Sequence, residues 1–213
     1  MGRMILVEGL DLAGKSTLIQ GLEKRLTERG WLVEVRHGDL CEQNPVAGVT
    51  RQMMRWDPGF KPDEGAPLFL ASHLWDLRNF QPPIRPNHLH LQDSCALRSL
   101  AFERILGRRF YARQLESVVD RLPGFDAAYV LTASLKNRRE RFLKRAQNDL
   151  HDSFMLSDPV RFTLVDSELM HLCVEKCEAK LISTDDYTVE NLLEYVWQDL
   201  ARKLVGEPVA RPA

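Results

Sequence analysis

Long apolar runs are missing from this sequence of 213 residues. A membrane-spanning helix needs roughly 18 or more consecutive apolar residues, and no stretch approaches that length. Met1 to Arg3 lead directly into a predicted strand, so no secretory leader is expected. These absences predict a cytoplasmic protein that has no membrane partner.

Cysteine is also scarce, with four residues in the whole chain, and no paired C-x-x-C framework is present. This excludes a disulfide scaffold and fits a reducing compartment. Cys173 and Cys177 lie close to His171, which raises the alternative of a metal site. The i,i+4 spacing of the two cysteines within a helical pattern favours ordinary packing instead.

A strong charge of either sign is lacking as well. Lys and Arg number 29 and Asp and Glu number 30, which gives a formal net charge of −1. A protein dedicated to a nucleic-acid polymer is expected to be distinctly basic, so that class is excluded. Apolar residues make up 44% of the chain, and a chain of this length can bury one sizeable core. We predict a single domain over residues 1–205 and a loose tail over residues 206–213.

What the sequence does contain is a phosphate-binding motif. Residues Gly9–Ser16 read G-L-D-L-A-G-K-S and match G-x-x-x-x-G-K-[ST], the loop that wraps the phosphates of ATP or GTP. An apolar strand over Met4–Val7 precedes the loop, and an amphipathic helix over Ser16–Arg29 follows it. In that setting, backbone N–H groups and a helix N-terminus face an anion.

Each residue type in this loop has a chemical reason. Gly9 and Gly14 let the backbone curl where a side chain would clash. Lys15 places a positive charge on the β- and γ-phosphates, and Ser16 offers a hydroxyl to Mg²⁺. The predicted cofactors are therefore ATP and Mg²⁺. The predicted nucleotide-binding residues are Gly9, Leu10, Asp11, Leu12, Ala13, Gly14, Lys15, Ser16 and Thr17.

Strands and helices alternate along the rest of the chain. Residues 40–67 are expected to form an irregular lobe around one short helix, and Asp185 and Asp186 are expected to cap the last helix. The alternation predicts an α/β fold with a five-stranded parallel sheet and helices on both faces. Further strands are predicted over residues 31–36, 89–93, 126–132 and 179–184, and helices over 46–56, 68–80, 96–106, 110–121, 135–145, 159–178 and 189–204.

The strand ends carry candidate site residues, because ligands of open parallel sheets bind outside the C-terminal strand ends. Arg36 ends the second predicted strand, and His37 and Asp39 follow it, where a solvated loop is the alternative role. Asp93 ends the third strand, where a carboxylate can hold Mg²⁺. Asp93 or Ser94 would equally suit the N-cap of the next helix.

A basic segment follows the fourth strand. Residues 135–145 read L-K-N-R-R-E-R-F-L-K-R, and one short charge run is usually a solvated helix face. The functional alternative is an arginine lid over ATP at about residues 138–158, because arginines stabilise the charge that spreads over a migrating phosphoryl group. The predicted catalytic residues are Lys15, Asp11, Arg141 and Arg145.

The order of these pieces resembles the thymidylate kinase family of nucleoside and nucleotide kinases. Val7–Thr17 is similar to that family's F-E-G-x-D-x-A-G-K-[ST]-T, and Leu68–Asp76 is similar to its L-L-F-x-A-x-R-W-E helix. Asp93–Phe102 resembles D-R-Y-x-x-S-x-x-A-[YF], and Arg141–Ala146 resembles the R-x-x-x-R-G lid motif. The resemblance implies a P-loop kinase fold with a helical lid, ATP with Mg²⁺, and transfer of the γ-phosphate to a small-molecule acceptor. It also implies a homodimer, which is frequent in the family.

Several positions depart from the family pattern. Leu74 and Ser94 stand where the family carries arginines that grip the acceptor nucleotide, and Cys95 replaces a tyrosine. Relatives place a catalytic arginine in the loop or in the lid, and here Leu12 and Leu150 occupy those positions. A buried phosphate without cationic partners is costly, so a dTMP kinase that lost all of these groups would be hard to defend.

One explanation is relocation of the arginines. Arg78 follows Leu74 by four residues, and Arg98 follows Ser94 by four residues. Residues at i and i+4 share a helix face, so a long arginine can reach back across one turn. The predicted substrate-binding residues are Asp11, Arg36, Asp39, Leu74, Arg78, Ser94 and Arg98, and the predicted metal ligands are Ser16 and Asp93.

The other explanation is a changed acceptor, such as a nucleoside, a hydroxylated metabolite or an antibiotic that carries no phosphate. A base near the attacking oxygen is then useful, and Asp11, His37 or Asp39 could serve. Other classes fit less well. A GTPase needs a base-reading N-K-x-D motif, which is missing, and a catalytically inactive nucleotide-binding relative would not be expected to keep Lys15 and Asp93.

Overall fold

The computed structural model of the chain describes residues 1–56, 62–144 and 157–204. Five strands form one sheet in the order β2-β3-β1-β4-β5, and every pairing is parallel. All carboxyl ends of the strands therefore meet along one edge of the sheet, as predicted. The strands are β1 Arg3–Glu8, β2 Leu32–His37, β3 His88–Asp93, β4 Ala127–Thr132 and β5 Lys180–Ser183.

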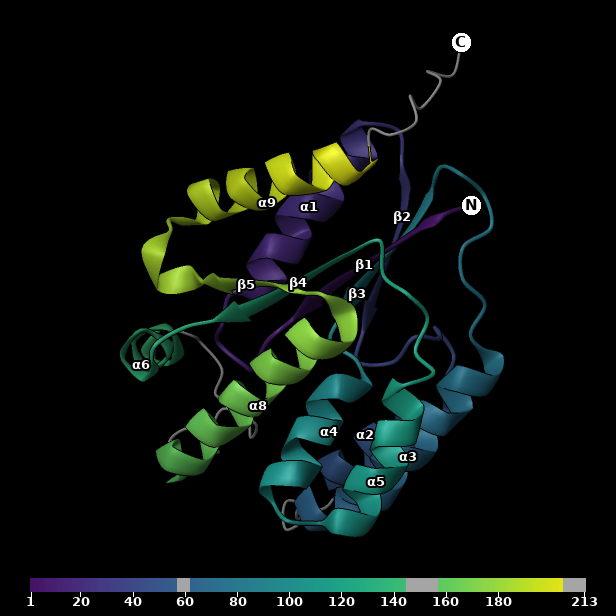
Figure 1. Cartoon of the computed structure of the whole chain (residues 1–213), viewed down its shortest axis with the longest axis vertical. Coiled ribbons are helices and arrows are strands. Elements are labelled where there is room, and N and C mark those ends of the chain that lie inside the picture. The colour runs from purple at the N-terminus through teal and green to yellow at the C-terminus, as the bar shows by residue number, and fades with distance from the viewer. Residues whose placement is uncertain (57–61, 145–156, 205–213) are drawn as a thin grey trace.

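Helices cover both faces of the sheet, which confirms the predicted α/β fold (Figure 1). On one face lie α1 (Lys15–Glu28) and α9 (Val189–Leu204). On the other face lie α4 (Ala96–Ile105), α5 (Arg109–Val119) and α8 (Pro159–Cys177). The remaining helices are α2 (Pro45–Trp56) and α3 (Pro62–Asn79), which pack against each other, and α6 (Leu135–Leu143), which follows β4.

The central strand β1 divides the core into two clusters. Ile5 and Val7 are buried against α1 and α9, whereas Leu6 is buried against α4 and α8. Successive side chains of a strand point to opposite faces, so a strand covered on both sides must be apolar throughout. That requirement explains the run Met4–Val7, and each fully buried aliphatic side chain contributes about 2 kcal/mol to stability. Cys173 packs in the second cluster with Cys177 against it, as predicted.

Helix α3 begins six residues earlier than the sequence predicts. The predicted start was Leu68, but α3 spans Pro62–Asn79 and includes Pro67. Proline inside a helix removes one backbone hydrogen bond, which is why the sequence argues for an irregular lobe here. Gly65 and Ala66 are nevertheless buried in this first part of the helix. Tertiary packing of small residues outweighs the local preference.

The cap of helix α9 also differs from the prediction. Thr188, and neither Asp185 nor Asp186, caps α9, because its Oγ1 accepts a hydrogen bond from the Asn191 N–H at 3.2 Å. The two aspartates belong to a short 3₁₀ turn, η1 (Thr184–Asp186). Asp185 instead accepts a hydrogen bond from the Ser134 N–H at 2.8 Å. It therefore joins the end of β5 to the beginning of α6.

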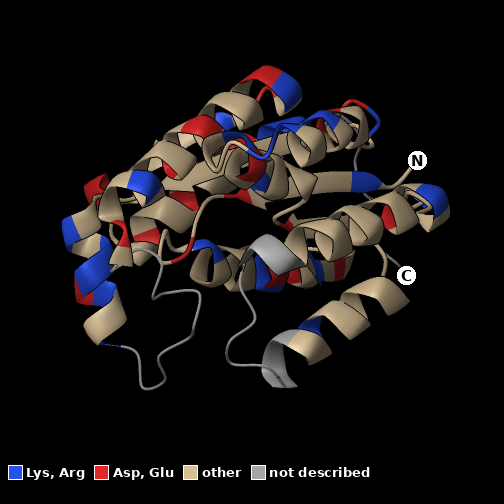
Figure 2. Cartoon of the chain, turned by 90° about the horizontal axis from the view of Figure 1, so that it is seen from below, with Lys and Arg blue, Asp and Glu red and all other residues tan. Residues whose placement is uncertain are grey.

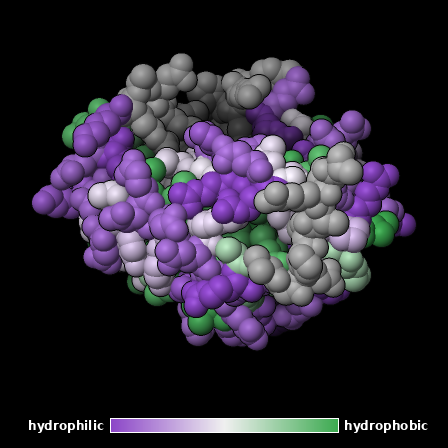
Figure 3. Space-filling model, turned by 90° about the horizontal axis from the view of Figure 1, so that it is seen from above, coloured by the Kyte–Doolittle hydropathy of each residue, from purple (hydrophilic) through white to green (hydrophobic). Residues whose placement is uncertain are grey.

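Charge and hydropathy are mixed over the surface. Figure 2 shows Lys and Arg interspersed with Asp and Glu over the elements in view. In Figure 3 the face seen from above is mostly hydrophilic, with small hydrophobic patches. Within the three described ranges, no helix combines the length and the apolar character needed to cross a membrane.

Candidate phosphate-binding site

The loop between β1 and α1 contains three residues with positive φ. Gly9 has φ 139°, Leu12 has φ 64° and Gly14 has φ 99°. A Cβ atom on Gly9 would lie 2.3 Å from the carbonyl oxygen of Leu131 on β4. Gly9 is therefore required both by its backbone conformation and by its close approach to the neighbouring strand. Leu12 adopts a conformation that glycine would occupy at lower cost.

The loop presents the beginning of α1 to solvent. Gly14 is the residue before the helix and offers no side chain to cap it. The first N–H groups of a helix have no acceptor within the helix, so they can face an anion. Ser16 and Thr17 are exposed in this first turn, whereas Lys15 is only 8% exposed. Lys15 and Ser16 therefore lie in the first turn of α1, as the motif predicts, and the Ser16 side chain is open to solvent.

Lys15 is held in the loop without a strong partner. Its Nζ donates a long hydrogen bond, 3.4 Å, to the carbonyl oxygen of Leu10. Burial and the nearby Arg98 guanidinium lower the pKa of Lys15 to about 8, and the carboxylates of Asp11 and Asp93 act in the opposite direction. A phosphate beside Lys15 would favour its charged form. The loop thus holds a cation that an anion would stabilise.

Four consecutive carbonyl groups of the loop each accept a hydrogen bond from a different cationic side chain. Three of the four donors are arginines of α4 and α6, and they lie far from the loop in the sequence. The donors and acceptors are Arg98 to Gly9 at 2.6 Å, Lys15 to Leu10 at 3.4 Å, Arg138 to Asp11 at 2.5 Å and Arg141 to Leu12 at 2.8 Å.

Glu8 connects the beginning of the loop to α4. This carboxylate is fully buried at the end of β1 and accepts hydrogen bonds from the Gly9 and Cys95 N–H groups, at 3.0 and 2.9 Å. Its Oε1 lies 3.6 Å from Nε of Arg98. Arg98 also lies 3.4 Å from the Asp11 carboxylate. The three carboxylates Asp11, Glu8 and Asp93 raise the pKa of the Arg98 guanidinium, although its burial acts against them.

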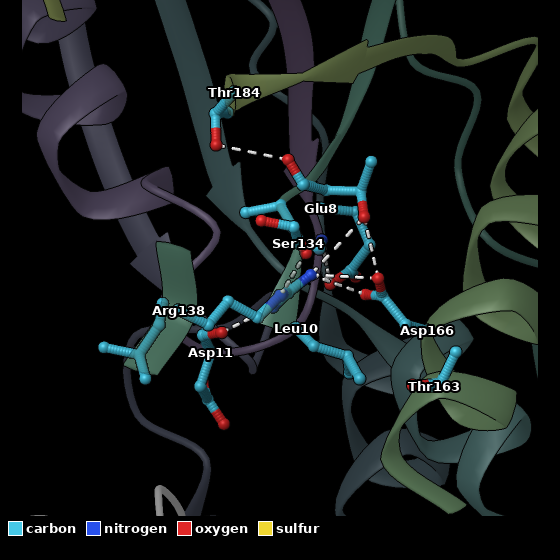
Figure 4. A network of polar contacts seen from close by, with 12 residues as sticks. Glu8, Leu10, Asp11, Ser134, Arg138, Thr163, Asp166 and Thr184 are labelled. Carbon is cyan, nitrogen blue, oxygen red and sulfur yellow. Dashed lines mark hydrogen bonds and ion pairs between the residues drawn. The ribbon is translucent and has the colours of Figure 1, made fainter. Parts of the chain in front are cut away.

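Arg138 lies behind the loop and is the largest fully buried side chain among the described residues (Figure 4). Its Nε donates to the carbonyl oxygen of Ala133 at 2.8 Å, and its Nη2 donates to both carboxylate oxygens of Asp166 at 2.9 Å. Burial lowers the pKa of this guanidinium, and Asp166 acts in the opposite direction. The prediction that the basic run forms a solvated face is therefore wrong for Arg138, because its charge is matched by a carboxylate from α8.

Asp93 lies at the carboxyl edge of the sheet beside the loop. Its Cα is the register partner of both Val7 on β1 and His37 on β2. The carboxylate is mostly buried, and its Oδ2 is 3.0 Å from Nδ1 of His37. The N-cap alternative is wrong for both Asp93 and Ser94, because Cys95 precedes α4 and its side chain makes no cap hydrogen bond. The role of Asp93 as a metal ligand stays a prediction.

The metal-binding residues that the sequence predicts fit Mg²⁺ by their chemistry. Ser16 contributes an exposed hydroxyl from the first turn of α1, and Asp93 contributes a carboxylate from the adjacent strand end. Mg²⁺ binds oxygen ligands and commonly takes one or two protein groups together with substrate phosphates and water. Both predicted ligands are oxygen donors, so the set suits this ion.

Two charged residues predicted on the acceptor side, Arg36 and Asp39, form ion pairs with other side chains of this chain. Arg36 pairs with Glu34 and, at 3.2 Å, with Glu42. The carboxylate of Asp39 is 2.8 Å from the guanidinium of Arg51 and accepts a hydrogen bond from Ser72. The half-buried guanidinium of Arg36 is thus neutralised by carboxylates of its own chain.

The two arginines considered as replacements lie in different surroundings. Arg98 reaches back to the loop, whereas Arg78 is exposed near the end of α3. Leu74 is 44% exposed, so it does not complete the apolar face that Leu70 and Leu77 form. Ser94 is buried and its N–H donates to the carbonyl oxygen of Val7 at 3.1 Å. The structure therefore brings only one of the two arginines to the loop.

Some site residues were missed by sequence reasoning or lie outside the described ranges. Glu8 precedes the motif directly but received no role, and Arg138 was considered only as part of the basic run that begins the predicted lid. Only the fold reveals their function, because their partners Cys95 and Asp166 are distant in the sequence. Arg145 and Leu150 lie outside the described residues, as does most of the predicted lid.

A cavity of about 380 Å³ lies between the ends of β4 and β5 and the helices α6 and α8. Its wall includes Thr132 and Asp166, so it adjoins the buried Arg138, but it includes none of the loop residues. A second hollow of about 440 Å³, lined mainly by apolar groups such as Leu135 and Leu164, lies beside it. Lys15 lines neither hollow. The candidate phosphate site is therefore defined by the hydrogen bonds of the loop and by its exposed groups, and not by a cavity.

Comparison with known proteins supports the fold. No family model matches this chain, and no curated protein matches it. A solved structure of thymidylate kinase from Candida albicans is similar to it, with a TM-score of 0.73 and 14% sequence identity. The match covers 99% of this chain and 96% of that one. Together with the parallel sheet and the loop between β1 and α1, this likeness shows a thymidylate-kinase-like P-loop kinase fold.

Proposed function

We propose that the protein is an ATP-dependent phosphotransferase that moves the γ-phosphate of ATP to a nucleoside, a nucleotide or a similar small acceptor. The observation that carries this proposal is the loop itself. It holds a buried Lys15 beside an exposed Ser16, with Arg98 and Arg141 within hydrogen-bond distance of its carbonyl groups. These are the groups that phosphoryl transfer requires, because its catalysis is mainly positioning and charge stabilisation.

The hydrogen bonds of Lys15 and Arg141 to neutral oxygens of the chain are ones that a phosphate could replace. Lys15 makes only a long hydrogen bond to Leu10, so its Nζ can turn toward a phosphate oxygen. Arg141 is partly exposed and donates to Leu12 and to the hydroxyl of Thr184, at 2.8 and 3.0 Å. An arginine that exchanges a neutral carbonyl for a phosphate oxygen gains a charge-assisted hydrogen bond. Lys15 and Arg141 are therefore the proposed catalytic cations, with Arg145 as a further candidate from the lid.

Ser16 and Asp93 would hold Mg²⁺. When bound, this ion neutralises charge on the phosphates. Asp11 lies at the acceptor end of the loop, and its carboxylate faces Arg98 at 3.4 Å. The remaining loop groups orient the donor, because the N–H groups at the beginning of α1 face the phosphates.

The acceptor has two candidates. Arg98, at the loop, supports an acceptor with one phosphate, since it supplies the cation that the family places at position 94. The pairing of Arg36 with Glu34 and Glu42, and the exposure of Leu74, favour a hydroxylated acceptor without a phosphate, such as a nucleoside, another metabolite or an antibiotic. A catalytically inactive relative is the outcome if no acceptor is used.

The test is an ADP-release assay with ATP and Mg²⁺ against nucleosides, nucleoside monophosphates and hydroxylated antibiotics. We expect release above the rate without acceptor for at least one class, and its loss when the metal is removed with EDTA. A Lys15→Ala variant that retains near wild-type turnover would contradict the proposal. Sedimentation of the same protein tests the expected homodimer.

A further inference from the structure

The buried guanidinium of Arg138 is one of the groups that attach the phosphate loop to the core. Arg138 is completely inaccessible to solvent, and its Nη1 donates to the carbonyl oxygen of Asp11 at 2.5 Å. On its other side, the ion pair with Asp166 joins it to α8 (Figure 4). One side chain therefore links three segments that are far apart in the sequence: the loop, α6 and α8.

We propose that Arg138 is a positioning residue for phosphate binding: anchored by Asp166, it fixes the Asp11 carbonyl and thereby the left-handed turn at Leu12. This inference rests on the proposed function insofar as the loop binds the phosphates of ATP. Arg138 faces away from solvent and would not itself touch the nucleotide. It acts through the backbone of the loop.

The left-handed turn needs such support. A leucine with φ 64° is strained by about 1–2 kcal/mol relative to its ordinary conformations. The carbonyl groups on both sides of its N–Cα–C unit are held, that of Asp11 by Arg138 and that of Leu12 by Arg141. The side chain of Leu12 is also buried in the core. The strained conformation persists because its surroundings determine it from three directions.

Only a guanidinium satisfies all of these acceptors at once. Nε donates to Ala133, Nη1 to Asp11 and Nη2 to Asp166, so each nitrogen has its own partner. The planar fork of arginine fixes these directions, whereas the single ammonium of a lysine cannot reach all three. Thr132 donates a third hydrogen bond to Asp166 at 2.7 Å, which orients the carboxylate.

Stability alone does not account for this ion pair. Removing two charges from water is costly, and well-packed apolar residues often replace a buried pair without loss of stability. Arg104 and Glu168 form an ion pair of similar length, 2.7 Å, between α4 and α8, although it is more exposed than the Arg138–Asp166 pair, and Arg104 also pairs with Glu116. Neither Arg104 nor Glu168 hydrogen-bonds the loop, so this link is a suitable control.

The first test uses the full chain without ligand and measures hydrogen–deuterium exchange of the amides of residues 10–15. The clamp variant carries Arg138→Met and Asp166→Leu, which removes both charges and keeps the volume apolar. The control carries Arg104→Met and Glu168→Leu. We expect loop exchange to be at least about tenfold faster in the clamp variant and unchanged in the control. Unchanged loop exchange in a folded clamp variant would overturn the proposal.

A conservative variant guards against misfolding of the double variant. Arg138→Lys keeps a positive charge beside Asp166 but cannot also hold Asp11. We expect loop exchange to rise in this variant while the exchange of β1 and β4 stays as in the wild type. Faster exchange of the loop and of these core strands to the same extent would indicate a merely structural role, and the inference would be wrong.

The second test measures the dissociation constant of a fluorescent ATP analogue with Mg²⁺. We expect about a tenfold weaker affinity in the clamp variant, which corresponds to about 1.4 kcal/mol, and no change in the control. Faster loop exchange with unchanged affinity would contradict a positioning role. If the wild-type protein binds no nucleotide, the proposed function fails, whereas the exchange experiment still decides whether Arg138 holds the loop.

Discussion

The guanidinium of Arg98, on α4, donates a hydrogen bond of 2.6 Å to the carbonyl oxygen of Gly9, the first residue of the phosphate loop. The same group lies 3.4 Å from the Asp11 carboxylate. Asp11 is the residue that resembles the acceptor-side aspartate of the thymidylate kinase family. Arg98 thus connects the donor side of the loop to the side on which an acceptor is expected.

Substitution of Arg98 tests which acceptor the protein uses. If the acceptor carries a phosphate, Arg98→Ala should raise the KM for the acceptor by about tenfold or more, because a charge-assisted contact is lost. Arg78→Ala is the control, since Arg78 is exposed on α3, and it should change the KM by less than about twofold. Steady-state ADP release measures both. Equal use of a nucleoside monophosphate by the wild type and by Arg98→Ala would rule out relocation of the family arginine.

Lys15 should be essential for transfer and dispensable for the fold. Lys15→Ala removes the cation nearest the predicted phosphates, and we expect turnover to fall by about 10²–10³-fold or more. Lys24→Ala changes an exposed lysine of the same helix and should leave turnover unchanged. Far-ultraviolet circular dichroism of both variants should match that of the wild type. A folded Lys15→Ala variant with wild-type turnover would exclude the loop mechanism.

The fold could be predicted from the sequence because its signals are local. The apolar run Met4–Val7, the glycine loop and the amphipathic helix after it occur in one continuous stretch, and each depends on residues close by. The errors arose where packing decides. Gly65 and Ala66 are buried in α3 despite Pro67, and Thr188 rather than an aspartate caps α9. Element boundaries follow tertiary contacts that no local pattern reports.

The site was predictable to the extent that its residues belong to a motif. Lys15 and Ser16 follow from the motif alone, and the structure leaves Ser16 exposed and Lys15 beside the loop carbonyls. Arg138 could not be identified, because its partners Asp11 and Asp166 are brought to it only by the sheet. A charge run on a helix is usually solvated, and nothing in the run distinguishes the buried Arg138 from its described neighbours Arg139 and Arg141.

Gly9 should tolerate no side chain. A Cβ at this position would lie 2.3 Å from the Leu131 carbonyl oxygen, so Gly9→Ala forces β1 and β4 apart, and we expect about 3 kcal/mol or more of destabilisation. Gly30 is the control, because its φ is also positive, at 86°, but nothing lies within 4 Å of the added atom. Gly30→Ala should cost only about 1 kcal/mol. Urea denaturation measures both, and equal losses would show that the close contact is not the cause.

Stability should fall as the pH falls below neutrality, because two histidines, His73 and His90, are buried. His73 is almost inaccessible, and its Nε2 lies 2.9 Å from Oγ of Ser99. Burial lowers its pKa from 6.5 to about 4, although the Asp39 carboxylate acts in the opposite direction. Between these two values the unfolded chain binds a proton at His73 that the folded protein does not. The contribution of neutral His73 to the free energy of unfolding is therefore fully present above pH 6.5 and is lost as the pH approaches 4.

The size of this loss follows from the shift and amounts to about 3 kcal/mol for His73. His73→Gln keeps a hydrogen-bonding group for Ser99 and cannot titrate, so the free energy of unfolding should depend less steeply on pH between 4 and 6.5. Some dependence should remain, because burial also lowers the pKa of His90. Urea denaturation at a series of pH values measures these slopes. If His73→Gln has the wild-type slope, His73 takes up its proton in the folded protein as readily as in the unfolded chain, and burial does not control its titration.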